Sequence, residues 1–325
     1  MLESALVYRA AQTARTLSLP EQIDAPSPGR EAFLEGFRQR NAFLDYLFYD
    51  IGVITPDEAR RLSPRWAAEG AILLVPPSGR GAAKICLGID AFIEAGGADV
   101  ATLVVAGVGS SALGSAAFAR NVADAVGEPV AAVVSGYGLA DVATEALGGF
   151  FWFGMLNQLR HSFERFDRFL EPKVVAQASP EESASQAFVR LSKDTQTVLA
   201  LLGDRRFSFT LLAGHSKGNL VLSEALYELR DRDAARIDEL ANTVRLVTVS
   251  ARIAMPPPFA DVIDVMGEWD WFGGLNSRPD IKADRIAPSA WHHTNTEIPF
   301  HLPVTAMMRD VLALPRQQHG SSAAA

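Results

Sequence analysis

The sequence predicts an α/β fold, a doubly wound and mostly parallel sheet with helices on both faces. From about residue 70 onward, short apolar runs alternate with helix-like stretches. The runs are continuously apolar, which is typical of strands that are buried on both faces. The chain has 325 residues, 48% of them hydrophobic, so it can bury the large core that such a sheet needs.

The alternating elements occupy residues 67–315, which we treat as one domain. Strands are expected at 71–76, 101–105, 129–135, 207–213, 244–250 and 261–266. Helices are expected at 83–95, from the end of a Gly/Ser loop at 107–114 to about 126, and at 181–202, 219–230 and 302–312. A strand–helix series of this kind favours parallel pairing, because each helix carries the chain back across the sheet.

Three segments stand outside this alternation. Residues 1–66 are expected to form a helical N-terminal extension, in which Thr55-Pro56-Asp57-Glu58 is typical of a helix start. Residues 138–173 are an insertion rich in aromatic side chains, and it is open whether they form a helical pair packed on the core or a lid over an apolar pocket. The tail at 316–325 is expected to be disordered.

Composition excludes several classes of function. The formal net charge of −8 is spread over both signs, which argues against nucleic acid as a partner. Cys86 is the only cysteine, so neither an internal disulfide nor a cysteine-rich zinc site is expected. His292 and His293 are adjacent and therefore poorly placed to share one zinc ion. There is no signal-peptide pattern and no apolar stretch long enough to span a bilayer, so we expect a cytoplasmic protein without a cofactor.

The most informative motif is the pentapeptide Gly214-His215-Ser216-Lys217-Gly218, which has the form G-x-S-x-G. An apolar run precedes it and a helix-like stretch follows it. On a sharp strand-to-helix turn, a serine presents its hydroxyl above the sheet, and glycines on either side leave room for the tight turn. Ser216 is therefore the candidate nucleophile.

A serine hydroxyl needs an imidazole base, which is itself oriented by a carboxylate. In hydrolases of this topology the carboxylate follows the serine in the chain and the histidine comes last. The preferred acid is Asp270, because it lies just past the end of the strand at 261–266, where α/β sheets bind ligands. Glu268 and Asp264 are the alternatives.

Three histidines lie after Asp270 and before the tail, namely His292, His293 and His301. His301 is the preferred base, because it opens a helix-like segment and follows a loop at the expected end of the sheet. His293 is the main alternative. His215 adjoins the nucleophile, where its ring would not reach the hydroxyl correctly.

Three short blocks resemble the catalytic blocks of class 3 lipase-like α/β-hydrolases. They are Gly214-His215-Ser216-Lys217-Gly218, Gly267-Glu268-Trp269-Asp270 and Glu297-Ile298-Pro299-Phe300-His301-Leu302. The resemblance covers residues 70–315 at most. It implies a serine hydrolase that cleaves small-molecule or lipid-like acyl esters through an acyl-enzyme, with Ser216, Asp270 and His301 as its triad. The helical N-terminal region and the aromatic insertion depart from the family pattern.

An oxyanion hole needs two backbone N–H donors. The resemblance implies that one is the N–H of Lys217, and that the other comes from the loop after the strand at 101–105, at Val108 or Gly109. Residues 77–79 are the alternative if the strands are numbered differently.

Two other functions remain open. Gly107-x-Gly109-x-x-Ala112 lies between a strand and a helix and fits a dinucleotide-binding fingerprint, but the next strand, at 130–135, ends without the acidic residue that would bind a ribose. The chain could also be a scaffold or binding protein that keeps a hydrolase fold without activity.

Overall fold

The computed structural model describes residues 2–23, 39, 42–63, 69–107, 110–135 and 192–317. An eight-stranded sheet runs through its centre in the order β2-β1-β4-β3-β5-β6-β7-β8. The strands from β4 to β8 pair in parallel, while β1 is antiparallel to both of its neighbours. The protein therefore has the mixed α/β fold with a mostly parallel sheet that the sequence predicts.

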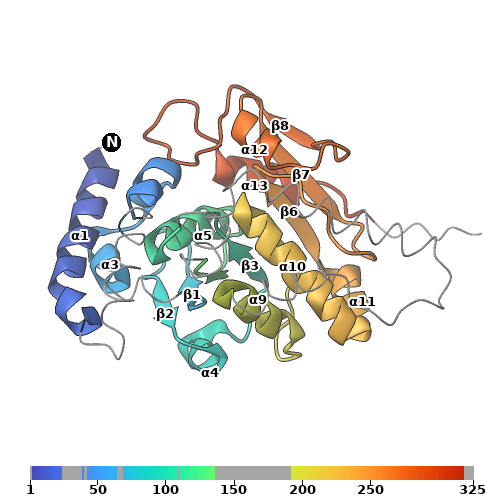
Figure 1. Cartoon of the computed structure of the whole chain (residues 1–325), viewed down its shortest axis with the longest axis horizontal. Helices are drawn as coiled ribbons and strands as arrows, with labels where there is room; N and C mark the ends of the chain where they lie inside the picture. Colours follow the sequence, from blue (N-terminus) through green and yellow to red (C-terminus); the bar gives the residue numbers. More distant parts are fainter. Residues whose placement is uncertain are drawn as a thin grey trace, which may run out of the picture.

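Figure 1 shows the sheet flanked by helices, with α1 at one end of the molecule and β8 and α11 toward the other. The strands are β1 (Ile72–Val75), β2 (Lys84–Cys86), β3 (Thr102–Val105), β4 (Val130–Val133), β5 (Leu211–His215), β6 (Arg245–Val249), β7 (Val262–Gly267) and β8 (Arg285–Ala287). The main helices are α1 (Leu2–Ile23), α3 (Pro56–Leu62), α4 (Ile89–Phe92), α5 (Ala112–Val126), α9 (Lys193–Gly203), α10 (Lys217–Arg232), α11 (Ala234–Thr243), α12 (Trp271–Leu275) and α13 (Val304–Leu312). Short turns of other helix types lie at η1 (Ile51–Val53) and η3 (Ile93–Gly97).

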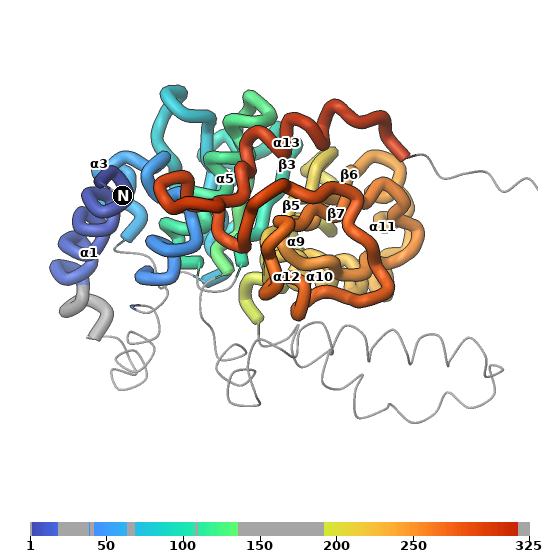
Figure 2. Tube along the Cα trace, turned by 90° about the horizontal axis from the view of Figure 1, so that it is seen from above, coloured from blue at the N-terminus to red at the C-terminus, as the bar shows by residue number. Residues whose placement is uncertain are grey.

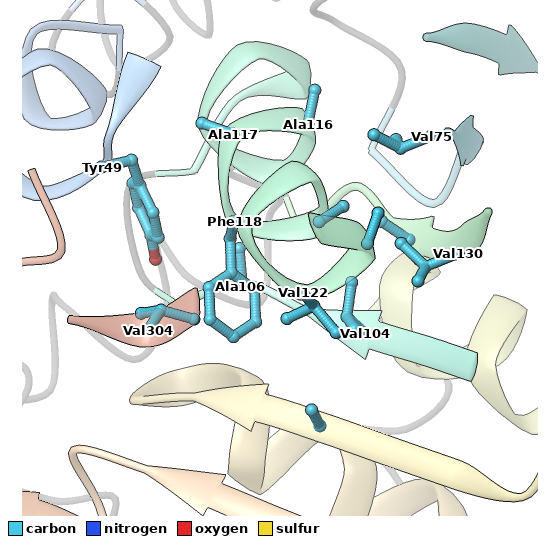
Figure 3. Close-up of a cluster of buried hydrophobic side chains, with 14 of the residues drawn as sticks. Tyr49, Val75, Val104, Ala106, Ala116, Ala117, Phe118, Val122, Val130 and Val304 are labelled. Atoms are coloured by element: carbon cyan, nitrogen blue, oxygen red, sulfur yellow. The ribbon is translucent and has the colours of Figure 1, made fainter. Parts of the chain in front are cut away.

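Side chains of each strand alternate between two hydrophobic cores, one on each face of the sheet. In β1, Leu73 and Val75 point to the core under α5 and α13, whereas Ile72 and Leu74 point to the core under α9, α10 and α11. Figure 3 shows part of the first core, where Phe118 of α5 packs above the strands. Both faces of the sheet are thus covered, as continuous apolar runs predict.

The expectation of a helix over residues 83–95 is wrong in its first half. Lys84–Cys86 form β2, which pairs with β1 as an antiparallel hairpin, and helical backbone starts only at Ile89. The reason is the connection at 76–83, where Gly79 and Gly81 take positive φ angles of 76° and 129° and turn the chain straight back. This hairpin is also why β1 runs against the strand on its other side.

The remaining predicted strands and helices are present, with ends shifted by a few residues. The largest shift is in β5, which begins at Leu211 rather than at 207. The structure adds β8, α11 and α12, which the sequence pattern did not indicate. The predicted helix at 181–202 is described only from residue 192. None of the described helices is long and apolar enough to cross a membrane.

The described part of the N-terminal region packs into the same core as the sheet. Residues 42–48 are helical, and Tyr49, Ile51 and Ile54 are almost fully buried within the core under α5. The helix start predicted at Thr55 is confirmed, because the Thr55 side chain and Glu58 form a reciprocal capping box at the beginning of α3. The division of the chain into an N-terminal extension at residues 1–66 and a domain at 67–315 stays a prediction.

Two expectations concern segments that lie wholly or mostly outside the described residues. The insertion at 138–173, with its two open interpretations, lies outside the described residues. The tail expected at 316–325 is described only to Gln317, and Arg316 donates hydrogen bonds to the carbonyls of Thr243 and Thr210. The described chain therefore stays in contact with the fold slightly beyond the expected boundary.

Candidate active site

The candidate residues gather at the carboxyl ends of the parallel strands. β4 lies on one side of β3 and β5 on the other, so the winding of the chain reverses between β3 and β5. Ser216 follows β5 and Gly107 comes shortly after β3. Crevices at such a reversal are where open α/β sheets bind their ligands.

Ser216 sits on a strained turn between β5 and α10. Its φ and ψ angles are 52° and −118°, a backbone conformation that side chains other than glycine rarely adopt. Neither flanking glycine has room for a side chain. A Cβ at Gly218 would lie 2.7 Å from the carbonyl carbon of Val105, and one at Gly214 would lie 2.8 Å from the backbone nitrogen of Asn219. The pentapeptide therefore forms the tight strand-to-helix turn that it predicts.

Asp270 follows β7 and is the N-cap of α12. Its Oδ1 accepts a hydrogen bond of 2.7 Å from the N–H of Gly273, which fixes the carboxylate at the helix start. Burial by itself would raise the pKa of this carboxyl. The hydrogen bond and charge of His292, together with the Gly273 N–H, outweigh burial and hold the pKa of Asp270 below its ordinary value. Asp270 is thus held as a carboxylate.

His292 lies between Asp270 and Ser216. Its Nδ1 is 2.9 and 3.0 Å from the two carboxylate oxygens of Asp270, and its Nε2 is 3.2 Å from Oγ of Ser216. A carboxylate can only accept a hydrogen bond, so Nδ1 carries the ring proton and donates a hydrogen bond to Asp270. In the neutral ring Nε2 is then free to accept from the hydroxyl of Ser216. This is the tautomer that a general base needs.

The structure brings Ser216 and Asp270 together, as expected, but with His292 in place of His301. His301 stands at the far end of the loop that begins at His292, near Asp50. Its charge there opposes the effect of burial, which raises the pKa of Asp50. The contacts expected of His301 with Ser216 and Asp270 are thus made by His292 instead. A 2.7 Å hydrogen bond from the N–H of Trp291 to the carbonyl oxygen of Phe300 joins the two ends of the loop.

His293, the alternative base, is occupied in the loop itself. Its Nε2 lies 3.1 Å from the carbonyl oxygen of Pro299, so Nε2–H donates there. Burial also lowers the pKa of His293, which favours the neutral ring. No sequence signal separates His292 from its neighbour, because only the direction of each side chain in the loop after β8 distinguishes them.

The alternative acids lie elsewhere. Asp264 is inside β7, where it is hydrogen-bonded to the hydroxyl of Thr248, and burial raises its pKa to about 6. Glu268 accepts a hydrogen bond of 2.7 Å from the backbone of Ser289 at the surface. The carboxylate that contacts His292 is that of Asp270, which does so with both oxygens.

Of the expected oxyanion-hole donors, only Lys217 lies within the described residues. Lys217 is the first residue of α10, so its N–H has no partner within the helix. Val108 and Gly109 lie outside the described residues. The alternative at 77–79 is wrong, because β1 is antiparallel to β4 and residues 77–79 therefore follow the opposite edge of the sheet.

The Lys217 side chain does not reach toward the crevice. It is almost fully buried, and its Nζ lies 3.8 Å from the carboxylate of Asp194 at the start of α9. Charges buried this deeply are tolerated only as pairs. The side chain of Lys217 therefore joins the start of α10 to the start of α9.

Aromatic rings enclose His292. The ring of Phe272 meets the His292 ring edge-on at 4.8 Å between centroids, and Phe48 does the same from the N-terminal region at 6.0 Å. His292 itself is only 3% exposed. Such surroundings exclude water and strengthen the electrostatic interactions among Asp270, His292 and Ser216.

Within the part of the chain that the structure describes, no group of three His, Cys, Asp or Glu side chains is arranged to hold a metal ion. Comparisons with protein-family models, with curated proteins and with solved structures gave no match to this chain.

Proposed function

We propose that the protein is a serine hydrolase that cleaves carboxylic esters through an acyl-enzyme intermediate. The observation that carries the proposal is the continuous hydrogen-bonded series Asp270–His292–Ser216. In this series the donor and acceptor of each hydrogen bond are those that acyl transfer requires. The chain order of serine, acid and histidine supports it. The position of the serine at the carboxyl edge of the sheet supports it as well.

The reaction follows from these contacts. His292 Nε2 takes the proton of the Ser216 hydroxyl while Oγ forms a bond to the ester carbonyl carbon, whose π electrons move onto the oxygen. Asp270 stabilises the imidazolium that results. When the tetrahedral intermediate collapses, His292 gives its proton to the departing alkoxide and an alcohol leaves. Water, activated by the same imidazole, then releases the carboxylic acid and restores Ser216.

The developing oxyanion needs donors that are already in place. The N–H of Lys217 suits this role, since it stands at the N-terminus of α10, where the helix dipole favours negative charge. The second donor would come from the loop after β3. The N–H of Gly107 already donates to the hydroxyl of Tyr49 at 2.6 Å. The second oxyanion donor would therefore be the N–H of Val108 or Gly109.

A dinucleotide-binding function has less support. In that fingerprint the first glycine, here Gly107, serves the tight turn, and the second, Gly109, would let the pyrophosphate approach the backbone; Gly109 lies outside the described residues. Here the space beside Gly107 is filled by protein, since a Cβ would lie 2.9 Å from both Ser216 Cβ and His215 O. The need for glycine at this position is therefore explained by the packing of the nucleophile turn.

The test is hydrolysis of p-nitrophenyl acetate by three proteins, namely the wild type, Ser216→Ala and Ser223→Ala. Ser223 is a matched control, because it lies on the same helix, is buried and donates to the carbonyl of Ala254. We expect Ser216→Ala to lose at least about 10³-fold in kcat, as removal of a triad nucleophile does. Ser223→Ala should keep its activity. An inactive wild type would favour the scaffold alternative, and an active Ser216→Ala would refute the nucleophile assignment.

A series of p-nitrophenyl esters of rising acyl length then addresses the substrate. Activity that rises from acetate to octanoate would fit a long apolar pocket under a lid. A preference for acetate would count against that pocket without affecting the triad.

A further inference from the structure

The loop that carries His292 rests on the N-terminal segment. Thr294 donates two hydrogen bonds to the carbonyl of Phe48, one of 2.7 Å from its N–H and one of 3.1 Å from its hydroxyl. Asn295 donates to the carbonyl of Tyr46 at 2.8 Å, and Thr296 to the carboxylate of Asp50 at 2.8 Å. In Figure 2 the loop after β8 lies beside this blue segment. Three consecutive residues of the loop are therefore fixed by residues 46–50.

The same segment, residues 45–50, is hydrogen-bonded to both ends of the loop that follows β3, at Gly107 and at Ser111. Asp45 and Tyr49 are one helical turn apart, as the 2.9 Å hydrogen bond from Tyr49 N–H to Asp45 O shows, so their side chains share a face. The carboxyl group of Asp45 accepts hydrogen bonds from the N–H of Ser111 at 2.9 Å and from that of Gly114 at 3.2 Å. The Tyr49 hydroxyl accepts the N–H of Gly107 at 2.6 Å. This is the loop to which the second oxyanion donor is assigned.

Tyr49 also reaches the residue next to the nucleophile. Its hydroxyl lies 3.1 Å from Nδ1 of His215, and Nε2 of His215 lies 3.1 Å from the backbone oxygen of His292. Figure 3 shows the Tyr49 ring beside α5, close to Phe118. Tyr49 and His215 are each only 1% exposed, so neither group has water as an alternative partner.

The direction of every hydrogen bond in this series is determined. A carbonyl oxygen only accepts, so His215 Nε2–H donates to His292 O, and Nδ1 of the neutral ring must accept. Tyr49 therefore donates its O–H to Nδ1, and its oxygen accepts the N–H of Gly107. Burial, followed by the neighbouring His292, lowers the pKa of His215 to about 3, which keeps this ring neutral.

We infer that Tyr49 is a positioning residue of the active site, which acts through His215 to hold the nucleophile turn and the loop of His292 in register and which holds Gly107 directly. The inference rests on the proposed function and goes beyond it. The N-terminal helical segment then belongs to the site. Loss of the Tyr49 hydroxyl leaves Nδ1 of His215 and the N–H of Gly107 without their partner, while every group that touches substrate stays in the chain. Displacements on the ångström scale at a site of this kind cost as much as about 10²-fold in rate.

The experiment compares Tyr49→Phe with Tyr227→Phe, using p-nitrophenyl acetate. Tyr227 is equally buried, and its hydroxyl donates to the backbone of Met255 in the second core. We expect kcat of Tyr49→Phe to fall about 10- to 100-fold with KM unchanged within about twofold. Both constants of Tyr227→Phe should stay within about twofold of the wild type. Equal behaviour of the two variants would overturn the inference.

A second pair of variants keeps the test sharp if Tyr49→Phe does not fold. Gln at position 215 retains one donor and one acceptor, whereas Leu retains neither. We expect His215→Gln to have a kcat at least about tenfold higher than that of His215→Leu, and equal losses would overturn the inference.

Histidine ¹⁵N spectra report the tautomer directly. In the wild type, His215 should be protonated at Nε2, and Tyr49→Phe should shift only the Nδ1 signal of His215, toward that of a nitrogen that accepts no hydrogen bond. A wild type with no esterase activity refutes the proposed function and this inference with it, whereas an active wild type whose Tyr49→Phe variant matches Tyr227→Phe refutes the inference alone.

Discussion

Nε2 of His292 lies 3.2 Å from Oγ of Ser216, although the two residues are 76 positions apart in the chain. Two strands bring them together, since Ser216 directly follows β5 and His292 comes soon after β8. The contact selects one of three histidines that the sequence leaves in competition. It also leads to the first prediction.

Replacing His292 should remove the activity, and replacing His301 should not. We expect His292→Ala to lose about 10³-fold or more in kcat, because Ser216 then has no base. His301→Ala changes a residue that lies near Asp50 and should stay within about threefold of the wild type. The measurement is kcat on p-nitrophenyl acetate for both variants. The reverse ranking would restore His301 as the base.

Asp270→Asn should keep the fold and lose most of the activity. Asn is also a good N-cap, so the start of α12 survives, but it no longer fixes the proton on Nδ1 of His292. A loss of about 10⁴-fold in kcat is typical of this change in a serine triad. Asp264→Asn is the matched control from the preceding strand and should stay close to the wild type. Comparable losses in the two variants would contradict the assignment of the acid.

The glycines of the nucleophile turn should differ in tolerance from a glycine nearby. In Gly218→Ala the new Cβ meets the backbone of Val105, which belongs to β3 and cannot move aside. We expect the free energy of unfolding to fall by about 3 kcal/mol or more. A Cβ at Gly274, in α12, meets nothing within 4 Å, so Gly274→Ala should change stability by less than about 1 kcal/mol. Chemical denaturation of both variants checks this, and a tolerated Gly218→Ala would contradict the described turn.

Asp45 should make the protein less stable as the pH rises. Burial raises the pKa of Asp45 from 3.8 to about 8, despite the hydrogen bonds from Ser111 and Gly114 that lower it. Below pH 4 the side chain is protonated in both states and has no effect. Between pH 4 and 8 the unfolded chain ionises while the folded one stays protonated, so stability is lost, by up to about 1.4 kcal/mol per pH unit.

Asp45→Asn has no proton to lose and is the control. Its free energy of unfolding, measured by denaturant at pH 5 and at pH 7, should therefore improve relative to the wild type as the pH rises. If the free energy of unfolding of the wild type instead rises relative to that of Asp45→Asn between pH 5 and pH 7, Asp45 is ionised in the folded protein.

The sequence was sufficient for the parts of the fold and site that depend on local pattern. The runs at β1, β3, β4, β6 and β7 can be recognised in the sequence, because strands buried on both faces are predominantly apolar. The turn at Ser216 is equally visible, since its two glycines are required by backbone contacts that any such turn makes. Asp270 could be found because it follows a recognisable strand.

The missed features depend on tertiary contacts. β2 has only three residues, too few to show a strand pattern, and its pairing with β1 makes it a strand. β8, a strand of three residues with two exposed side chains, carries no apolar signal. Without β8, the end of the sheet near His292 could not be located, and the motif around His301 was the stronger local pattern. The role of Tyr49 is likewise invisible in the sequence, since its partners lie 58 and 166 positions away.

The central claim is that Ser216 is a nucleophile activated by His292, and reaction with a fluorophosphonate tests it most directly. The labelled peptide is identified by mass spectrometry, and the labelling rate is compared among the wild type, Ser216→Ala, His292→Ala and His301→Ala. The account predicts label on Ser216, none in Ser216→Ala, and a rate that falls at least about 10²-fold in His292→Ala but not in His301→Ala. Label on another residue, or equal rates in His292→Ala and the wild type, would contradict it.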